Sequence, residues 1–311
     1  PGGSLGCTEF LATLYFNHLK HNTEFDMNGI NEDLFFLSNG HISPVLYSVL
    51  ARSGYFDIKE LATFRKINSR LQGHPTTHEK LEGIRVATGS LGQGLSVAIG
   101  AAITKKLNKD DQLIYSLHGD GELQEGQIWE AVMYASANKI DNIIATIDYN
   151  KKQIDGEIDD VLPMGNLRAK FEAFDWLVLE EKNGNDLKSI STVLSNAKEM
   201  TKQGKPIVIL LHTEMGNGVD FMMGTHKWHG NAPNDEQLEI ALAQNTISGT
   251  IRDANGPLPG ANVIEAGTNN GVSTDFDGNF EISVSDGASL EISYTGYFTQ
   301  TIEVGSQSSF D

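Results

Sequence analysis

The sequence is poor in cysteine, and its basic residues are far outnumbered by acidic ones. Cys7 is the only cysteine, so no disulfide can form within the chain and a reducing compartment is favoured. The 23 Lys and Arg residues stand against 41 Asp and Glu residues, a formal net charge of −18. That balance argues against a nucleic-acid partner, which needs a basic face. An anionic ligand must then be held by local devices such as a metal ion, helix N-termini or histidines.

Long apolar runs are missing as well. No stretch of about 18 consecutive apolar residues occurs, so the sequence predicts no membrane-spanning helix. Hydrophobic residues make up 39% of the chain, which is enough for a packed core. At roughly 150 residues per domain, the 311 residues of the chain correspond to about two domains. The sequence starts at Pro1 rather than Met, which leaves a preceding targeting segment open.

A strand–turn–helix–strand pattern occupies the middle of the sequence. The apolar run Gln112–Leu117 ends at Gly119-Asp120-Gly121, where two glycines allow a sharp turn and the close approach of a ligand. A helical pattern follows, and the apolar run Asn142–Ile147 then leads to Asp148-Tyr149-Asn150. Both strands of a right-handed βαβ unit end on the same edge of the sheet. Asp120 and Asn150 are therefore predicted to meet where open α/β sheets bind ligands.

The pair Asp120 and Asn150 indicates a particular kind of ligand. A carboxylate and an amide oxygen suit Mg²⁺ or Ca²⁺, and Mg²⁺ usually binds through few protein groups together with ligand phosphates. The pattern thus predicts a metal-bridged diphosphate. It is typical of thiamine-diphosphate enzymes, and residues 122–127, Glu-Leu-Gln-Glu-Gly-Gln, resemble the transketolase family. The resemblance implies that Asp120, Asn150 and the Lys152 carbonyl bind the metal, with Gly119 and Gly121 against the cofactor.

Two histidine motifs resemble the same family. His41 closes Ser38-Asn39-Gly40-His41 after the predicted strand Asp33–Asn39, and His229 lies within residues 225–230, Thr-His-Lys-Trp-His-Gly. The resemblance implies that His41 and His229 contact the diphosphate. The second motif, followed by Ala-Pro, resembles transketolase N-terminal subunits that are encoded apart from their partner halves. Deoxyxylulose-phosphate synthase and dehydrogenase α subunits use the same cofactor, but these motifs favour transketolase.

The remaining site residues come from two loops and a helix. The resemblance implies that His74, in Gly73-His74-Pro75, touches the donor sugar. It also implies that Gly89 and Leu91 border the thiazolium and pyrimidine rings. Glu125 and Glu130 are either solvated helix residues or, as the family implies, members of a carboxylate network at the dimer interface. The resemblance therefore predicts four catalytic residues: His41, His74, Glu125 and His229.

Two different folds are predicted along the chain. Helices alternate with apolar runs up to Pro206–His212, which predicts a doubly wound α/β domain with a mostly parallel sheet. From Thr246 on, short alternating runs separated by turns predict a small antiparallel all-β sandwich. Its Thr-Asp-Phe-Asp-Gly-Asn-Phe motif, residues 274–280, resembles carboxypeptidase-regulatory-like domains. Asp275 and Asp277 are interpreted as a β-turn, with calcium binding as the alternative.

These observations predict a domain organisation and a function. We expect a transketolase-like domain over residues 1–244, truncated at its start, and a β-sandwich over residues 246–311 that lacks a last strand. The expected activity is ketol transfer between sugar phosphates, in the cytoplasm, with thiamine diphosphate, Mg²⁺ and a separately encoded pyrimidine-binding subunit. We also expect a homo- or hetero-oligomer. The alternative is a non-catalytic surface protein that works through the β-domain, whose relatives lie outside the cytoplasm. The junction between the two domains is either a natural fusion or the result of an assembled or translated sequence that joins two genes.

Overall fold

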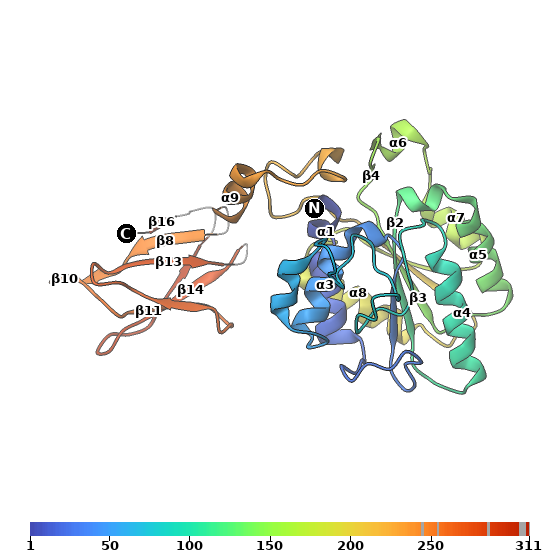
Figure 1. Ribbon diagram of the computed structural model, residues 1–311, viewed down its shortest axis with the longest axis horizontal. Coiled ribbons are helices and arrows are strands. Elements are labelled where there is room, and N and C mark those ends of the chain that lie inside the picture. Colours follow the sequence, from blue (N-terminus) through green and yellow to red (C-terminus); the bar gives the residue numbers. More distant parts are fainter. Residues whose placement is uncertain (244–245, 254, 285–286, 305–308, 311) are drawn as a thin grey trace. The chain divides into compact units, whose positions relative to one another are not determined.

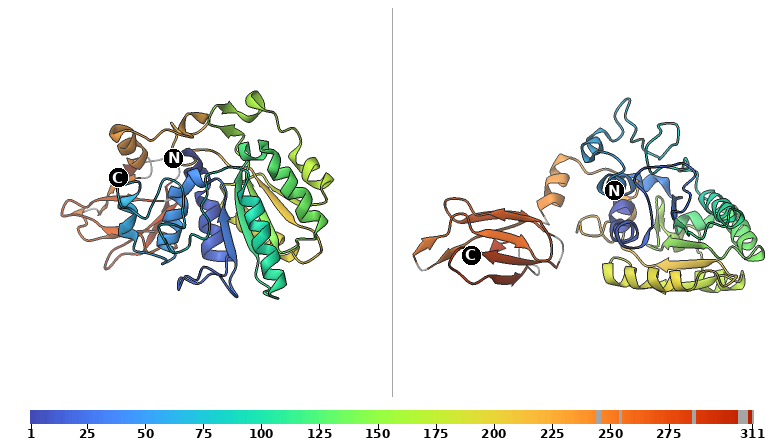
Figure 2. Two further views of the ribbon diagram at one scale, coloured as in Figure 1. Left: turned by 45° about the vertical axis from the view of Figure 1, so that its right-hand side comes forward. Right: turned by 90° about the horizontal axis from the view of Figure 1, so that it is seen from below.

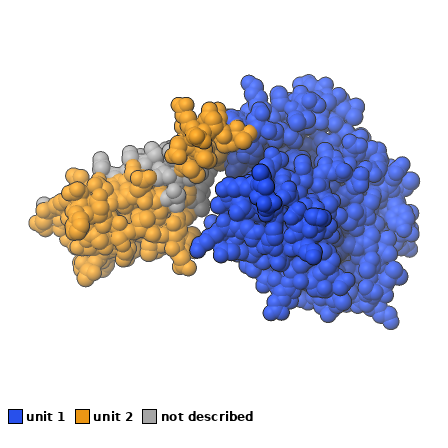
Figure 3. Space-filling model, viewed as in Figure 1, with its two compact units in different colours: residues 1–217, 221–231 blue, residues 218–220, 232–311 orange. Residues whose placement is uncertain are grey.

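The computed structural model describes residues 1–243, 246–253, 255–284, 287–304 and 309–310. The chain divides into two compact units (Figure 3). The first comprises Pro1–Asn217 and Phe221–Asn231, and the second comprises Gly218–Asp220 and Ala232–Asp311. The predicted junction at Gln244 and Asn245 and the expected turn at Ser285-Asp286 lie outside the described residues.

A five-stranded parallel sheet forms the centre of the first unit (Figure 1). All four neighbouring strand pairs are parallel. β1, β3 and β7 are buried along their whole length, which explains their nearly continuous apolar sequences. In spatial order the strands are β1 (Leu34–Leu37), β2 (Ile114–Gly119), β3 (Ile143–Asp148), β7 (Ile207–Leu211) and β6 (Leu177–Glu181).

Helices cover both faces of this sheet (Figure 2). Side chains alternate across a strand, so Phe35 and Leu37 of β1 belong to one core cluster while Leu34 and Phe36 belong to the other. The first face is covered by α2 (Thr8–Thr13), η1 (Leu14–His18), α3 (Ser43–Arg52) and α8 (Leu187–Glu199), and α1 (Gly2–Gly6) packs against α2 and α3. The second is covered by α4 (Gly94–Leu107), α5 (Gly126–Ala137) and α7 (Leu167–Ala173). The predicted doubly wound α/β architecture is confirmed.

Shorter elements connect these layers. Residues Ile58–Thr63 form a 3₁₀ helix, η3, because its N–H groups bond three residues back, as from Glu60 to Asp57. Asp57 caps it, accepting from the Lys59 N–H. The short elements are η2 (Gly40–Ile42), η3 (Ile58–Thr63), η4 (Gly121–Gln124), β4 (Lys152–Gln153), β5 (Gly156–Glu157), α6 (Ile158–Val161) and η5 (His226–Trp228).

The second unit contains a helix and two packed sheets around one apolar cluster. α9 (Asp235–Ala243) precedes the sheets. The four-stranded sheet is β12 (Gly271–Ser273), β11 (Asn262–Glu265), β14 (Ser289–Ser293) and β15 (Gln300–Glu303). The three-stranded sheet is β13 (Asn279–Ser283), β8 (Thr246–Thr250) and β16 (Ser309–Phe310), and β9 (Arg252–Asp253) pairs with β10 (Gly256–Pro257). Ile247 and Phe280 from one sheet meet Val263 and Leu290 from the other.

This arrangement confirms the predicted small β-domain, with one exception to its antiparallel pattern. β16 pairs with β8 in parallel, and the strand before it in sequence, β15, belongs to the other sheet. The Asp275 carboxylate accepts hydrogen bonds from the N–H groups of Asp277 and Asn279, as expected for the β-turn interpretation. Among the described residues, no helix has the length and apolarity needed to cross a membrane.

Candidate functional site

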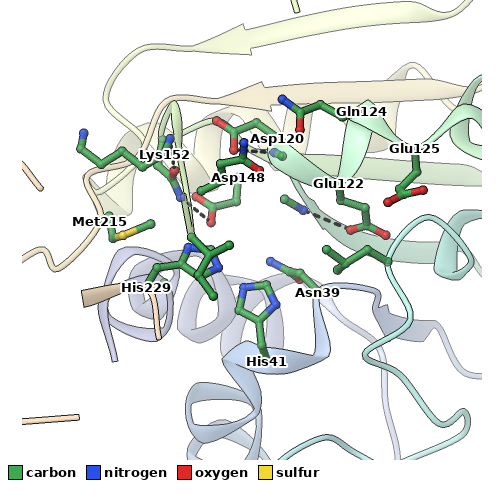
Figure 4. A pocket seen from close by; sticks show the side chains of 17 residues that line it. Asn39, His41, Asp120, Glu122, Gln124, Glu125, Asp148, Lys152, Met215 and His229 are labelled. Carbon is green, nitrogen blue, oxygen red and sulfur yellow. Dashed lines mark hydrogen bonds between the residues drawn. The ribbon is translucent and has the colours of Figure 1, made fainter. Parts of the chain in front are cut away.

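A cavity of about 160 Å³ opens where β1, β2 and β3 end (Figure 4). Gly119 in β2 pairs with Asp148 in β3, so the residues that follow both strands reach the same level of the sheet edge. The predicted meeting of Asp120 and Asn150 is thus found in the structure, since both line the cavity. Further lining residues include Asn39, His41, Leu91, Glu125, Lys152 and His229.

Two buried carboxylates, Asp120 and Asp148, form one side of the cavity. Asp120 accepts from the N–H groups of Gly121 at 2.8 Å and Lys151 at 2.5 Å. Burial and the charge of Asp148 raise the Asp120 pKa well above its usual range, and burial raises the pKa of Asp148. The Asn150 amide donates to Asp148 at 3.0 Å. Two desolvated carboxylates side by side favour a bound cation, which would offset both the burial and the repulsion.

Two histidines lie together facing the same cavity. The rings of His41 and His229 have centroids 4.8 Å apart and planes inclined by 31°. Burial, followed by the charges of His229 and His74, lowers the pKa of His41 to about 4; burial also lowers the pKa of His229. In Figure 4 both rings and the two aspartates border the cavity. His41 and the aspartates come from the ends of β1, β2 and β3, whereas His229 follows η5. A neutral histidine pair at pH 7 can donate to an anion or take up a proton from it.

Several buried polar atoms at this site lack a partner among the described residues. They are Oδ1 of Asn39, Nε2 of Gln153 and Nδ1 of His229. A buried polar group without a hydrogen bond costs free energy, so these atoms favour the binding of a polar ligand. All three residues line the cavity.

Some of the other predicted site residues line the cavity, and others do not. Leu91 and Glu125 line it, as does Lys152, whose ammonium group is 3.9 Å from Glu214. His74 and Gly89 are not among the lining residues. They contact each other instead, since a Cβ on Gly89 would lie 2.7 Å from His74 Cδ2. Glu130, on α5, is exposed outside the cavity.

Three residues of this region are not predicted as site residues by the sequence patterns. Asp148 is the last residue of a buried strand. A charged residue at that position is the feature of the sequence that could have indicated a site residue. Gln153 follows Asn150 by three positions and offers only a weak signal. Glu122 lies inside the recognised motif but is fully buried. Burial alone would raise its pKa, but the nearby His118 ring and hydrogen bonds from Ser38 and Gly92 outweigh that effect and lower it.

The histidine pair predicts how stability depends on pH without cofactor. The folded pKa of His41, about 4, lies below an unfolded value of about 6.5. Between these values the unfolded state binds more protons, so the free energy of unfolding falls as pH drops from about 6.5 toward 4. We expect His41→Gln to reduce this loss in thermal unfolding between pH 7 and 4.5. His78→Gln, at an exposed position, is the control, and an equal reduction there would contradict the assignment.

Comparisons with known proteins find a match for each of the two predicted domains. Residues 1–249 match the family model "Transketolase, thiamine diphosphate binding domain" and residues 247–311 match "CarboxypepD_reg-like domain". The "6-deoxy-6-sulfo-D-fructose transketolase subunit SqwG" of Clostridium sp. (strain MSTE9) is 39% identical over 246 residues, covering 78% of this chain and 86% of that relative. An apulose-4-phosphate transketolase subunit of Phocaeicola vulgatus is 37% identical over 78% of this chain and 84% of its own length.

Longer relatives share the same region. The transketolase of Staphylococcus aureus (strain MRSA252) is 35% identical over 252 residues, which cover 78% of this chain but 37% of that protein. The crystal structure of Campylobacter jejuni transketolase superposes with a TM-score of 0.71 at 36% identity, covering 78% of this chain and 38% of that one. The chain therefore spans under two fifths of these longer proteins.

Proposed function

The chain belongs to the family of transketolase thiamine-diphosphate-binding domains, and we propose that it forms the diphosphate- and metal-binding half of an enzyme that transfers a two-carbon ketol unit between sugar phosphates. The observation that carries this proposal is the cavity itself. Buried carboxylates from the ends of β2 and β3 and the His41–His229 pair border one space. That combination provides for a metal ion and for an anion at the same site.

The residues of the cavity fit the cofactor and a divalent cation. We assign Asp120, Asn150 and the Lys152 carbonyl to Mg²⁺ or Ca²⁺, where the cation would relieve the two adjacent buried carboxylates. His41 and His229 would bind the diphosphate, and the unpartnered atoms of Asn39 and Gln153 offer further polar contacts. When bound, thiamine diphosphate supplies the carbanion chemistry, and the protein supplies position and electrostatics.

The chain's own residues would also orient the sugar. We place His74 at the donor hydroxyl, with His229 nearby to hold and return a proton. Leu91, beside the cavity, would border the cofactor rings, together with the Gly89 backbone. Glu125, at the start of α5 and partly in the cavity wall, would join the carboxylate network toward a partner domain.

A second protein completes this proposal. The Clostridium and Phocaeicola relatives, both of which this chain covers over most of their length, are each named as a subunit of a transketolase, which supports assembly with a separate chain. We propose that a separately encoded pyrimidine-binding half supplies the remaining site, and that the complex acts on sugar phosphates in the cytoplasm. We further propose two modules, residues 1–244 for catalysis and residues 246–311 as an independent β-domain.

The decisive experiment is reconstitution. The 311-residue chain and a pyrimidine-binding transketolase half are assayed separately and mixed, with thiamine diphosphate, Mg²⁺, a ketose phosphate and an aldose phosphate. We expect ketol transfer only in the mixture, since each half provides part of the site. Equal rates for the chain alone would contradict the division of the site. Failure of the chain to bind thiamine diphosphate even in the mixture would favour a non-catalytic role carried by the β-domain.

A further inference from the structure

The Glu122 side chain joins three separate segments of the site. Its carboxylate is inaccessible to solvent. Oε1 accepts from the Gly92 N–H at 2.8 Å and from the Ser38 hydroxyl, and Oε2 accepts from the Gly119 N–H at 3.3 Å. These donors come from the end of β1, the loop before α4 and the end of β2. One buried carboxylate therefore contacts every segment that leads to His41, Leu91 and Asp120.

Glycines let these segments approach one another closely. A Cβ on Gly94 would lie 2.4 Å from the Ser38 Cβ, and one on Gly40 would lie 2.8 Å from the Gly89 N. Gly92 has a φ of +85° and a Cβ there would lie 2.8 Å from the Glu125 Cβ. The Gly89–Gly94 loop thus packs tightly on its neighbours, and none of its side chains belongs to either of the two core clusters of the first unit. Its position depends on polar contacts, of which the Glu122 carboxylate makes the central ones.

The Glu122 carboxylate also lies near a buried histidine. The His118 Nδ1 lies 3.7 Å from Glu122 Oε2, and both side chains are fully buried. Hydrogen bonds to a charged group are stronger than those between neutral groups. A neutral amide of the same size would keep one acceptor, but it would present N–H donors where the Gly119 N–H now donates.

We propose that Glu122 is a positioning residue, which holds the Gly89–Gly94 loop, and through it the Leu91 side chain, against the segments that carry His41 and Asp120. This inference rests on the proposed cofactor site in the same cavity. Glu122 does not act on substrate itself. It sets the distance between the loop that borders the cofactor rings and the turn that carries Asp120.

The test compares Glu122→Gln with the unmodified chain, each mixed with the pyrimidine-binding half. We expect the Kd for thiamine diphosphate with Mg²⁺ to rise by at least ~10-fold, because a buried hydrogen bond to a charged group is lost. The Kd for inorganic pyrophosphate with Mg²⁺, which lacks the rings, should rise by a smaller factor. In the chain alone, amide hydrogen exchange at residues 89–94 should accelerate. Ser38→Ala should change the same quantities in the same direction, and it keeps the test valid if Glu122→Gln does not fold.

Glu199→Gln is the matched control, since it removes one carboxylate from an exposed position at the end of α8. It should change neither Kd nor loop exchange. Unchanged thiamine diphosphate binding and unchanged exchange in Glu122→Gln and Ser38→Ala would overturn the positioning role while leaving the proposed function intact. If the unmodified mixture binds no thiamine diphosphate, the proposed function fails. Loop exchange in the chain alone then still decides whether Glu122 fixes the loop.

Discussion

Replacing Asp120 with alanine is expected to abolish saturable binding of thiamine diphosphate in the presence of Mg²⁺. Asp120 lies in the turn after β2, is 1% exposed and faces Asp148. In the proposed site its carboxylate is the one formal charge among the three metal ligands. Removing one partner of a buried charge interaction costs ~3–5 kcal/mol, a factor of at least ~100 in Kd. Equilibrium dialysis of the cofactor with and without Mg²⁺ measures this directly.

Two further variants separate the metal contact from folding. Asp120→Asn keeps the volume and an acceptor oxygen for one of the two N–H donors, Gly121 or Lys151, so we expect it to fold and still lose most cofactor affinity. Asp155→Ala removes an aspartate from the exposed turn between β4 and β5 and should bind like the unmodified chain. Cofactor binding by Asp120→Ala at the unmodified Kd would remove Asp120 from the site.

The central part of this site can be predicted because it depends on local pattern and chirality. The turn after β2 and the residues after β3 are separated by a single helix, and a right-handed crossover returns the chain to the same sheet edge. The register Gly119↔Asp148 follows from two apolar runs of similar length. Sequence alone therefore places Asp120 and Asn150 together correctly.

Other features depend on packing between distant segments, and sequence pattern does not encode these. Ser38 and Glu122 are 84 positions apart. The sequence around Glu122 does not show whether its side chain is buried or solvated. His74 and Gly89 contact each other and are not among the residues that line the cavity. Their positions depend on the conformation of the loop between them. The parallel pairing of β16 with β8 likewise joins strands from opposite ends of the β-domain sequence.

The helices beside the site carry exposed apolar side chains that predict an interface. Val97 on α4 is 38% exposed, and Met133 and Tyr134 on α5 are 56% and 51% exposed. α4 begins just after Leu91 and α5 just after Glu125, so both helices start at the proposed cofactor site. Exposed apolar groups next to a site that we propose is completed by another chain favour a surface covered by that chain.

Tyr134→Asp is therefore expected to prevent association of the chain with itself or with the pyrimidine-binding half, and with it ketol transfer. A central aromatic residue of an interface contributes ~2 kcal/mol or more, so Kd should rise at least ~30-fold. Sedimentation velocity of the chain and of the mixture measures the change. Leu187→Asp, at a residue 56% exposed on α8, is the matched control and should assemble normally. A monomer in both unmodified samples, or normal assembly of Tyr134→Asp, would exclude α5 as the surface that completes the site.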